Sequence, residues 1–402
     1  MPACLIWIKN IHPAMPLLNQ YASAGIRGLI AAVLIWAAFL AVAPATAHEL
    51  QPAIADIIVA PDGGLTITIS TNLEAFLADI GPGHADSDDA PTAAIYNRLR
   101  ALPAVEIQAE VRRAADILHK SINLTVRETQ APLQIAEIAV DPVGSVALAR
   151  QSTLTFHATV PPGERPLIWQ SRPRLGDVVM RVSRQNEAEP YFTAYVTAGN
   201  RSDPVPLSIN ARQSSSDVFQ SYVATGFNHI VPKGPDHILF VIGLFLLSAR
   251  LRPLLTQITC FTLAHSITLG LGTIGAVHLP PAFVESLIAA SIIFVGIENL
   301  FTDRLHRWRP VLVFAFGLIH GLGFANVLGE FRLPDQDFLT ALIAFNVGVE
   351  LGQLLVIGAC FLAVGWRFSG KTWYRPYIVR PASLAIAAVG CVWYIERSGL
   401  LL

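Results

Sequence analysis

Charged residues are scarce in this sequence. They make up 14% of its 402 residues, whereas hydrophobic residues make up 53%, and an ordinary soluble protein carries nearer to ~25% charged residues. The formal net charge is −1, which argues against a nucleic-acid partner because nothing supplies the basic patch that phosphate binding needs. The composition therefore predicts that much of the chain lies in a lipid bilayer.

Cysteine is scarce as well. Of the four cysteines, Cys4 lies near the start of the chain, and Cys260, Cys360 and Cys391 lie in apolar runs. Residues 48–215, which carry most of the acidic residues, contain no cysteine. This polar segment must therefore be held together by its core rather than by disulfide bonds.

The first residues have the pattern of a secretory signal peptide. Arg27 precedes an apolar run at 28–42, and the small-residue sequence ATA follows at 45–47; these are the charged, apolar and cleavage regions of such a signal. We predict a signal peptide over residues 1–47, with Met15 as an alternative start. The alternative interpretation of the run is a retained anchor helix.

Residues 48–215 predict a periplasmic, β-rich and sandwich-like domain. Stretches in which apolar and polar residues alternate recur between Pro, Gly and Asp residues, which is the pattern of half-buried strands joined by turns. A helical insertion is predicted at 72–80 and 93–102. The alternating stretches are 65–70, 122–126, 153–160, 177–183 and 192–197.

Two features of this domain contain candidate metal ligands. If cleavage follows residue 47, the amine and imidazole of His48 could chelate copper or nickel, although a frayed terminus is the simpler interpretation. The segment 81–91 could bind a cation, although short acidic runs are usually solvated loops. Its candidate ligands are His84, Asp86, Asp88 and Asp89.

Residues 216–402 predict an all-α bundle of six transmembrane helices. Each of six apolar runs is near the ~20 residues that a bilayer requires. Arginine and lysine follow the first, third and fifth runs, so the positive-inside rule places those connections in the cytoplasm of a bacterial inner membrane. The runs are approximately 225–248, 254–277, 281–301, 310–329, 337–363 and 381–398.

Ionisable residues recur inside these runs. The first run is broken by Pro232, Gly234 and Pro235, and broken backbone is tolerated at membrane depth only inside protein or beside a wet cavity. Helix rise counted from the cytoplasmic boundaries places ionisable residues of five runs at ~16–24 Å, which is one level of the bilayer. Such residues are functional by default. The candidate metal ligands are Asp236, His237, His265, His320, His229, Glu350 and Glu285.

Imidazoles with nearby carboxylates suit nickel, cobalt, copper or zinc, whereas carboxylate and water alone suit magnesium or calcium. We expect Asp236 to act as a ligand or to orient a neighbouring imidazole. Small and polar residues beside the candidates predict close helix packing and a polar interior. These residues are Gly317, Gly321, Gly348, Gly352, Thr262, Ser266, Asn346 and Gln353.

Five motifs, in this order, resemble the HupE/UreJ family of hydrogenase and urease accessory membrane proteins, in its branch with a large exported domain. They are PKGPDHILF, FTLAHSITL, VESLIAASI, FGLIHGLGFA and FNVGVELGQL. The resemblance implies a nickel permease or metal-uptake role in which the His and Asp of the first motif matter most. Asp236 and His237 match that motif, but the family's histidine is followed by proline, whereas His229 is followed by Ile230.

We therefore predict a permease for a divalent transition metal, with no tightly bound cofactor and with metalloenzyme maturation proteins as candidate partners. The ion would leave past Glu298, unless that carboxylate pairs with Arg304. Two other hypotheses remain open. One is an intramembrane zinc hydrolase in which Asp236 or Glu350 activates water; the other is an accessory protein that anchors its β-rich domain.

Overall fold

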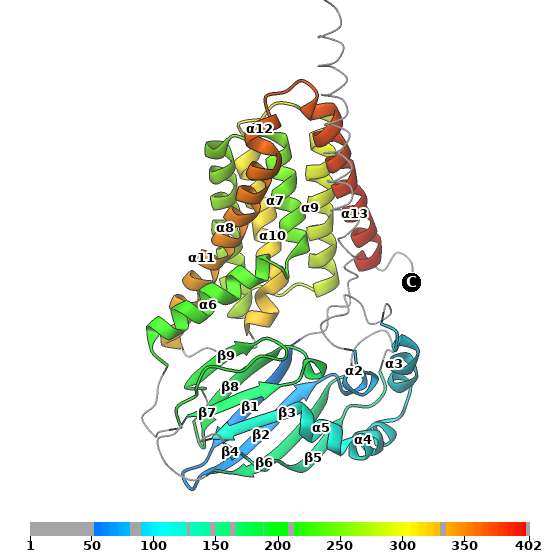
Figure 1. Cartoon of the computed structure of the whole chain (residues 1–402), viewed down its shortest axis with the longest axis vertical. Coiled ribbons are helices and arrows are strands. Elements are labelled where there is room, and N and C mark those ends of the chain that lie inside the picture. The colour runs from blue at the N-terminus through cyan, green and yellow to red at the C-terminus, as the bar shows by residue number, and fades with distance from the viewer. Residues whose placement is uncertain are drawn as a thin grey trace, which may run out of the picture.

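The structure, a computed structural model, describes residues 52–80, 90–126, 129–144, 150–160, 166–187, 189–207, 213–329 and 335–398. The predicted signal peptide at 1–47 lies outside the described residues, as do His48 and the candidate ligands at 84–89. What is described forms a β-rich part followed by a helical part, as predicted. In Figure 1 the β-rich part lies below the helical part, and helix α6 (Ser215–Ile230) lies across the boundary between them.

The β-rich part contains two sheets. The larger has the strand order β5-β6-β2-β1-β8-β9 and the smaller the order β4-β3-β7. Neighbouring strands are antiparallel except for β1 and β8, which are parallel. The strands are β1 (Ala53–Val59), β2 (Gly64–Thr71), β3 (Ile122–Val126), β4 (Thr129–Gln130), β5 (Gln134–Val140), β6 (Ser152–Thr159), β7 (Leu167–Ser171), β8 (Val178–Arg184) and β9 (Phe192–Val196).

Alternating side chains explain why these stretches form sheets. In β2 the side chains at even-numbered positions, such as Thr66 and Thr68, are polar and partly exposed, while Leu65, Ile67 and Ile69 are buried. Leu124 of β3 and Trp169 of β7 are buried in the same core, so the two sheets share one hydrophobic interior. All five predicted strand stretches are confirmed as β2, β3, β6, β8 and β9. The helical insertion is confirmed but longer than predicted, with α2 (Leu73–Ala78), α3 (Ala93–Arg100), α4 (Ala104–Arg113) and α5 (Ala115–Ser121).

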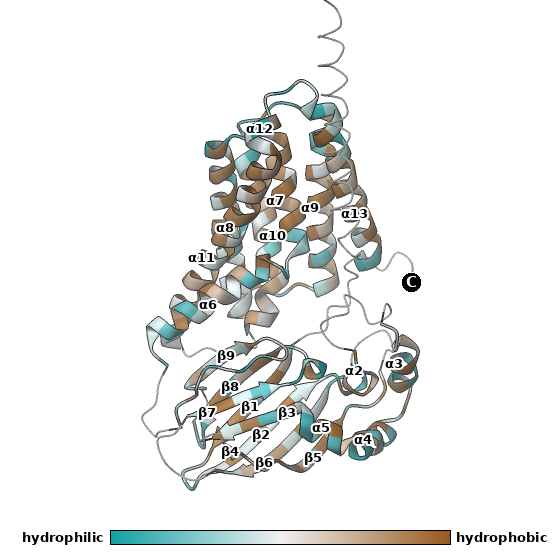
Figure 2. Cartoon of the chain, in the orientation of Figure 1, coloured by the Kyte–Doolittle hydropathy of each residue, from teal (hydrophilic) through white to brown (hydrophobic). Residues whose placement is uncertain are grey.

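The helical part is predominantly hydrophobic along its length, as Figure 2 shows. Four helical segments are long and apolar enough to cross a membrane, and α6 with α7 forms a fifth candidate that is bent by 70°. Within the described residues the remaining apolar helix, 309–325, is shorter, so the number of six spans stays a prediction. The helices are α7 (Pro235–Leu247), α8 (Leu251–Thr273), α9 (Pro281–Phe301), α10 (Arg309–Gly329), α11 (Asp335–Cys360), α12 (Trp366–Phe368) and α13 (Arg380–Ser398), with π-helical turns at Phe361–Gly365 and Arg375–Val379.

The first predicted span needs correction. It was expected to begin near residue 225, but α6 begins at Ser215 and ends at Ile230, and α7 leaves it at a sharp angle. Ser214 caps α6 by accepting a hydrogen bond from the backbone of Asp217. The polar residues 214–217, which hydropathy alone would place before the span, therefore form the first turn of its helix.

Glycines set how closely the helices pack. A Cβ added to Gly321 of α10 would lie 2.3 Å from the carbonyl oxygen of His265 in α8. One added to Gly348 of α11 would lie 2.1 Å from the carbonyl oxygen of Val223 in α6. The close packing predicted from the GxxxG spacings is confirmed, and it brings α10 against α8 and α11 against α6.

Candidate metal centre

The break between α6 and α7 places three candidate ligands together. His229 lies in the last turn of α6, and Pro235 begins α7 at the position that proline favours. Asp236 and His237 are consequently in the first turn of α7. The carboxylate of Asp236 accepts a hydrogen bond from the backbone N–H of His237 and lies 3.0 Å from its ring Nδ1.

Four histidines from four helices meet at this break. The ring of His237 lies 4.8 Å from that of His229, 4.9 Å from that of His320 and 5.9 Å from that of His265, measured between centroids. His237, His265 and His320 are all at most 2% exposed. Their donor atoms form two sets, His229–His237–His265 and Asp236–His237–His320, in which all atoms lie within 4.8 Å of one another. We call these five residues the histidine cluster; His237 belongs to both sets.

The hydrogen bonds of the cluster determine which ring nitrogens carry protons. Asn346 donates its amide N–H to the carbonyl oxygen of Leu342, so its amide oxygen is the acceptor that lies 3.2 Å from Nδ1 of His265. Nδ1 of His265 is therefore protonated and Nε2 keeps its lone pair. The carboxylate of Asp236 fixes the same tautomer in His237. Both Nε2 atoms are buried without a hydrogen-bond partner among the described residues.

His320 adopts the opposite tautomer for an equally local reason. The hydroxyl of Ser291 in α9 donates its one hydrogen to the carbonyl oxygen of Ile288 at 2.7 Å. It can therefore only accept from Nε2 of His320, which lies 3.1 Å away. Nδ1 of His320 is left with its lone pair and is buried without a partner in the described part of the chain, as is Nε2 of His229.

In His237, His265 and His320 this is the arrangement that metal-binding imidazoles adopt, with one nitrogen held by a hydrogen bond and the other free to coordinate. The upper limit of 4.8 Å between donor atoms is close to what an ion needs. Two ligands on opposite sides of an ion, each at ~2.1 Å as in zinc–imidazole bonds, would be ~4.2 Å apart. Small rotations of the rings would therefore bring three donors onto one ion.

Aromatic side chains close the cluster on two sides. On the side away from the β-rich part, each of three helices places a phenylalanine one turn from its cluster residue: Phe240, Phe261 and Phe316. The ring centroid of Phe240 lies 5.2 Å from that of Phe261 and 5.8 Å from that of Phe316. Phe324 and Phe345 stack 5.0 Å apart on the other side, beside His229. An ion in the cluster would be shielded from bulk water, which strengthens its interaction with the ligands.

Glu350 and Glu285 are not members of either donor set found among the described residues. The carboxylate of Glu350 accepts a hydrogen bond of 2.8 Å from the hydroxyl of Thr259, toward the outside of the bundle. Ser291 is a functional candidate that the sequence did not reveal. Serine hydroxyls in helices commonly bond a carbonyl of the preceding turn, so no pattern distinguishes one that also holds a histidine.

The predicted partner of Glu298 is also wrong. Its carboxylate lies 3.3 Å from the guanidinium of Arg309, which is fully buried, and not beside Arg304. The neighbouring Asn299 donates its side-chain N–H to the carbonyl oxygen of Gly243 at 2.8 Å. These contacts tie α9 to α10 and α7 at the end of the bundle away from the β-rich part, so Glu298 and Asn299 serve as a brace between helices.

The β-rich part contacts the break directly. Lys233, in the turn between α6 and α7, forms an ion pair with Asp177, which also accepts hydrogen bonds from the hydroxyl of Tyr195 at 2.6 Å and the backbone N–H of Ala198 at 2.8 Å. Burial by itself would raise the pKa of Asp177, but the hydrogen bonds and the charge of Lys233 outweigh it and lower that pKa below its usual value. This contact is called the interdomain latch below.

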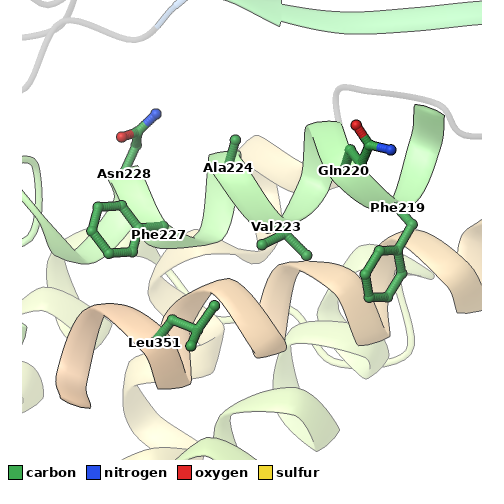
Figure 3. A pocket seen from close by; sticks show the side chains of 7 residues that line it. All are labelled: Phe219, Gln220, Val223, Ala224, Phe227, Asn228 and Leu351. Atoms are coloured by element: carbon green, nitrogen blue, oxygen red, sulfur yellow. The ribbon is translucent and has the colours of Figure 1, made fainter. Parts of the chain in front are cut away.

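A shallow groove of about 350 Å³ lies along α6, beside α11 (Figure 3). Its lining consists of Phe219, Val223, Ala224, Phe227 and Leu351, with the amides of Gln220 and Asn228. Carbon-rich walls of this kind suit an apolar chain rather than a cation. The groove is therefore distinct in chemistry from the histidine cluster, which offers nitrogen and carboxylate donors.

Comparison with known proteins gives one family. Residues 207–397, which include the helices from α6 to α13 except for the last residue of α13, and every member of the histidine cluster, match the family described as HupE / UreJ protein. The match confirms the resemblance that the five motifs indicated. Searches among curated proteins and among solved structures give no match.

Proposed function

Because residues 207–397 belong to the HupE/UreJ family, we propose that this chain is an inner-membrane permease for a divalent transition metal ion, with nickel as the first candidate and cobalt, copper and zinc as alternatives. The ion is the transported substrate rather than a resident cofactor. The single observation that carries the proposal is the histidine cluster, in which four imidazoles from separate helices each have one nitrogen without a protein partner among the described residues.

The ligand chemistry supports a transition metal. Neutral imidazole nitrogen is a borderline-soft donor that nickel, copper and zinc prefer, whereas magnesium and calcium prefer oxygen. One carboxylate, that of Asp236, offsets part of the ion's charge in a buried site. His229 is included on its geometry alone, because the residue after it departs from the family motif.

The surroundings of the cluster favour transport over hydrolysis. A hydrolase needs a groove in which a substrate reaches the metal, but aromatic rings flank the cluster on both sides. Ser266, which could have served as a nucleophile beside His265, donates its hydroxyl to the carbonyl oxygen of Thr262 at 2.7 Å. An enclosed site that opens alternately to each side is the arrangement that carriers use.

The orientation follows from charge. The α7–α8 and α9–α10 connections, whose sequences contain arginines, lie at the end of the bundle away from the β-rich part (Figure 1). The positive-inside rule places that end in the cytoplasm and the β-rich part in the periplasm. Export by the predicted signal peptide at 1–47 would give the same orientation.

Nickel uptake into proteoliposomes tests the proposal. Wild-type protein should show saturable uptake of radioactive nickel, and His237→Ala should abolish it because both donor sets lose a member. We expect nickel binding to weaken at least ~100-fold, since loss of a mere supporting contact already costs up to that factor. His278→Ala, which removes an exposed histidine of a connecting loop, is the matched control and should behave like wild type.

The other hypotheses predict different results. A hydrolase would bind zinc tightly without moving any ion into the liposomes. A protein that only anchors its β-rich domain for metalloenzyme maturation partners would neither bind nor transport metal, and His237→Ala would change nothing. Either result would refute the permease.

A further inference from the structure

A line of buried polar side chains leads away from the histidine cluster along the contact between α8 and α11. It begins at the His265–Asn346 hydrogen bond. One turn further from the β-rich part, the hydroxyl of Thr262 lies 3.1 Å from the side-chain amide oxygen of Gln353. Gln353 is seven residues beyond Asn346 in α11, which corresponds to ~10 Å of helix rise. Thr262 is 7% exposed and Gln353 is fully buried.

Counting protons shows that this pair can present a free amide oxygen in one of its two hydrogen-bonding arrangements. The Thr262 hydroxyl has one hydrogen and two acceptors within reach, the carbonyl oxygen of Ile258 at 3.0 Å and the amide oxygen of Gln353. Nε2 of Gln353 is buried without a hydrogen-bond partner among the described residues. If the hydroxyl donates to Ile258, the Gln353 amide turns over, donates to Thr262, and leaves its oxygen in the unpartnered position.

One turn further along α8, Gln257 repeats the feature. It is 1% exposed, and its side-chain N–H donates to the carbonyl oxygen of Pro253 at 2.9 Å. Its amide oxygen is therefore the free atom, and it has no partner in the described part of the chain. Between the histidine cluster and the end of the bundle away from the β-rich part, Gln257 thus offers an unpartnered oxygen, and Gln353 offers one when its amide is turned over.

The rest of that side of the cluster is closed by the rings of Phe240, Phe261 and Phe316. An ion that left its imidazoles for this layer would lose its ligands in an apolar environment, at a cost of many kcal/mol. Amide and hydroxyl oxygens lower that cost because they replace the water that the ion has lost. The polar contact between α8 and α11 is therefore the easier route.

We propose that Gln353, together with Thr262, is a second coordination station, through which the ion passes from the histidine cluster towards Gln257 and the cytoplasmic end. This inference rests on the proposed transport function. It replaces the expected exit past Glu298, whose carboxylate is engaged with Arg309. It also predicts that nickel binding at the cluster and nickel movement across the membrane can be separated by mutation.

The test compares Gln353→Leu, which keeps the size but removes the oxygen, with Gln353→Glu, which keeps an oxygen. Nickel binding is measured by calorimetry on the full chain in detergent, and uptake is measured in proteoliposomes. We expect Gln353→Leu to keep wild-type nickel affinity but to lose at least ~10-fold in initial uptake rate, equivalent to a 1.4 kcal/mol higher barrier. Gln353→Glu should still take up nickel, because its side chain keeps an oxygen at this position. The control is Gln220→Leu, the same substitution at an exposed position of α6, and it should match wild type in both measurements.

Uptake by Gln353→Leu at the wild-type rate would overturn the inference. So would an equal loss of binding and uptake, since Gln353 would then act on the cluster itself. If Gln353→Leu does not fold, Thr262→Val, which removes only the hydroxyl, is judged by the same two measurements. Absence of uptake in the wild type would instead refute the transport function on which the inference rests.

Discussion

Replacing Gly321 by alanine should weaken metal binding although every ligand remains. The new Cβ would lie 2.3 Å from the carbonyl oxygen of His265 and 2.3 Å from the hydroxyl of Thr268, whereas ordinary contacts begin at 3.4 Å. Helices α8 and α10 would have to separate by ~1 Å, which is far more than the ~0.2 Å tolerance of metal–ligand distances. His320, the residue next to Gly321, would move away from His265 by that amount.

We expect nickel to bind Gly321→Ala ~10–100-fold more weakly than wild type, the range seen when support of a ligand is lost. The clash should also lower the free energy of unfolding by ~1–3 kcal/mol, as overpacking usually does. Calorimetric titration with nickel and thermal unfolding in detergent measure the two effects. Gly358→Ala is the matched control, because a Cβ at that position in α11 would meet nothing within 4 Å. Wild-type nickel affinity in Gly321→Ala would show that close approach of α8 and α10 does not set the geometry of the cluster.

Two further predictions concern groups that hold the site in place. Ser291→Ala should weaken nickel binding ~10-fold, because Nε2 of His320 loses the contact that fixes its tautomer. The control is Ser286→Ala in the same helix, since the hydroxyl of Ser286 bonds the carbonyl oxygen of the preceding turn. Calorimetric titration with nickel compares the two variants, and equal affinity in both would contradict the prediction. The interdomain latch should add stability above pH ~3.8, where Asp177 is ionised in both the folded and unfolded states, and lose it as the pH falls through the lowered pKa of the folded state. The pair is partly buried, with 14% of the Asp177 side chain and 34% of the Lys233 side chain exposed, and we expect it to contribute about 1 kcal/mol, or a few degrees of melting temperature. Asp177→Asn should remove that stabilisation at neutral pH and make the melting temperature less dependent on pH below about 4, and an unchanged profile would refute the role of the latch.

The strands could be predicted because their pattern is local. In β2 and β6 every second side chain enters the core, and this alternation is visible in the sequence. The stretch that forms α4 and α5 was missed although its pattern is present in the sequence. Ile107, Val111 and Leu118 follow one another at spacings of four and seven residues, as on one buried face of a helix. The candidate ligands Asp236, His237, His265 and His320 could be selected because an ionisable side chain in an apolar run is costly and therefore conspicuous.

Which of the candidates meet could not be predicted. Glu350 and Glu285 occupy the same depth as the histidines by helix rise, but depth does not fix the direction in which a side chain points. That direction depends on how each helix is rotated against its neighbours, and here it is set by contacts such as Gly348 against the backbone of α6. The early start of α6 was missed for a related reason, because tertiary packing against α11 retains a helix whose first turn is polar.

The parallel pairing of β1 with β8 has a consequence for the order in which this protein can be made. β1 is a central strand of the larger sheet, yet one of its two partners follows it by well over a hundred residues. Until β8 has been synthesised, the backbone N–H and C=O groups along that side of β1 lack their final partners, and such an edge invites pairing with other chains. β8 and β9 are also the last strands before α6, so the sheet is completed only as the first helix of the bundle follows from the ribosome. A ribosome that stalls before β8 would therefore leave the larger sheet incomplete, with an unpaired edge at β1, whereas one that has passed the end of β9 at Val196 has supplied every strand of that sheet just ahead of the helices.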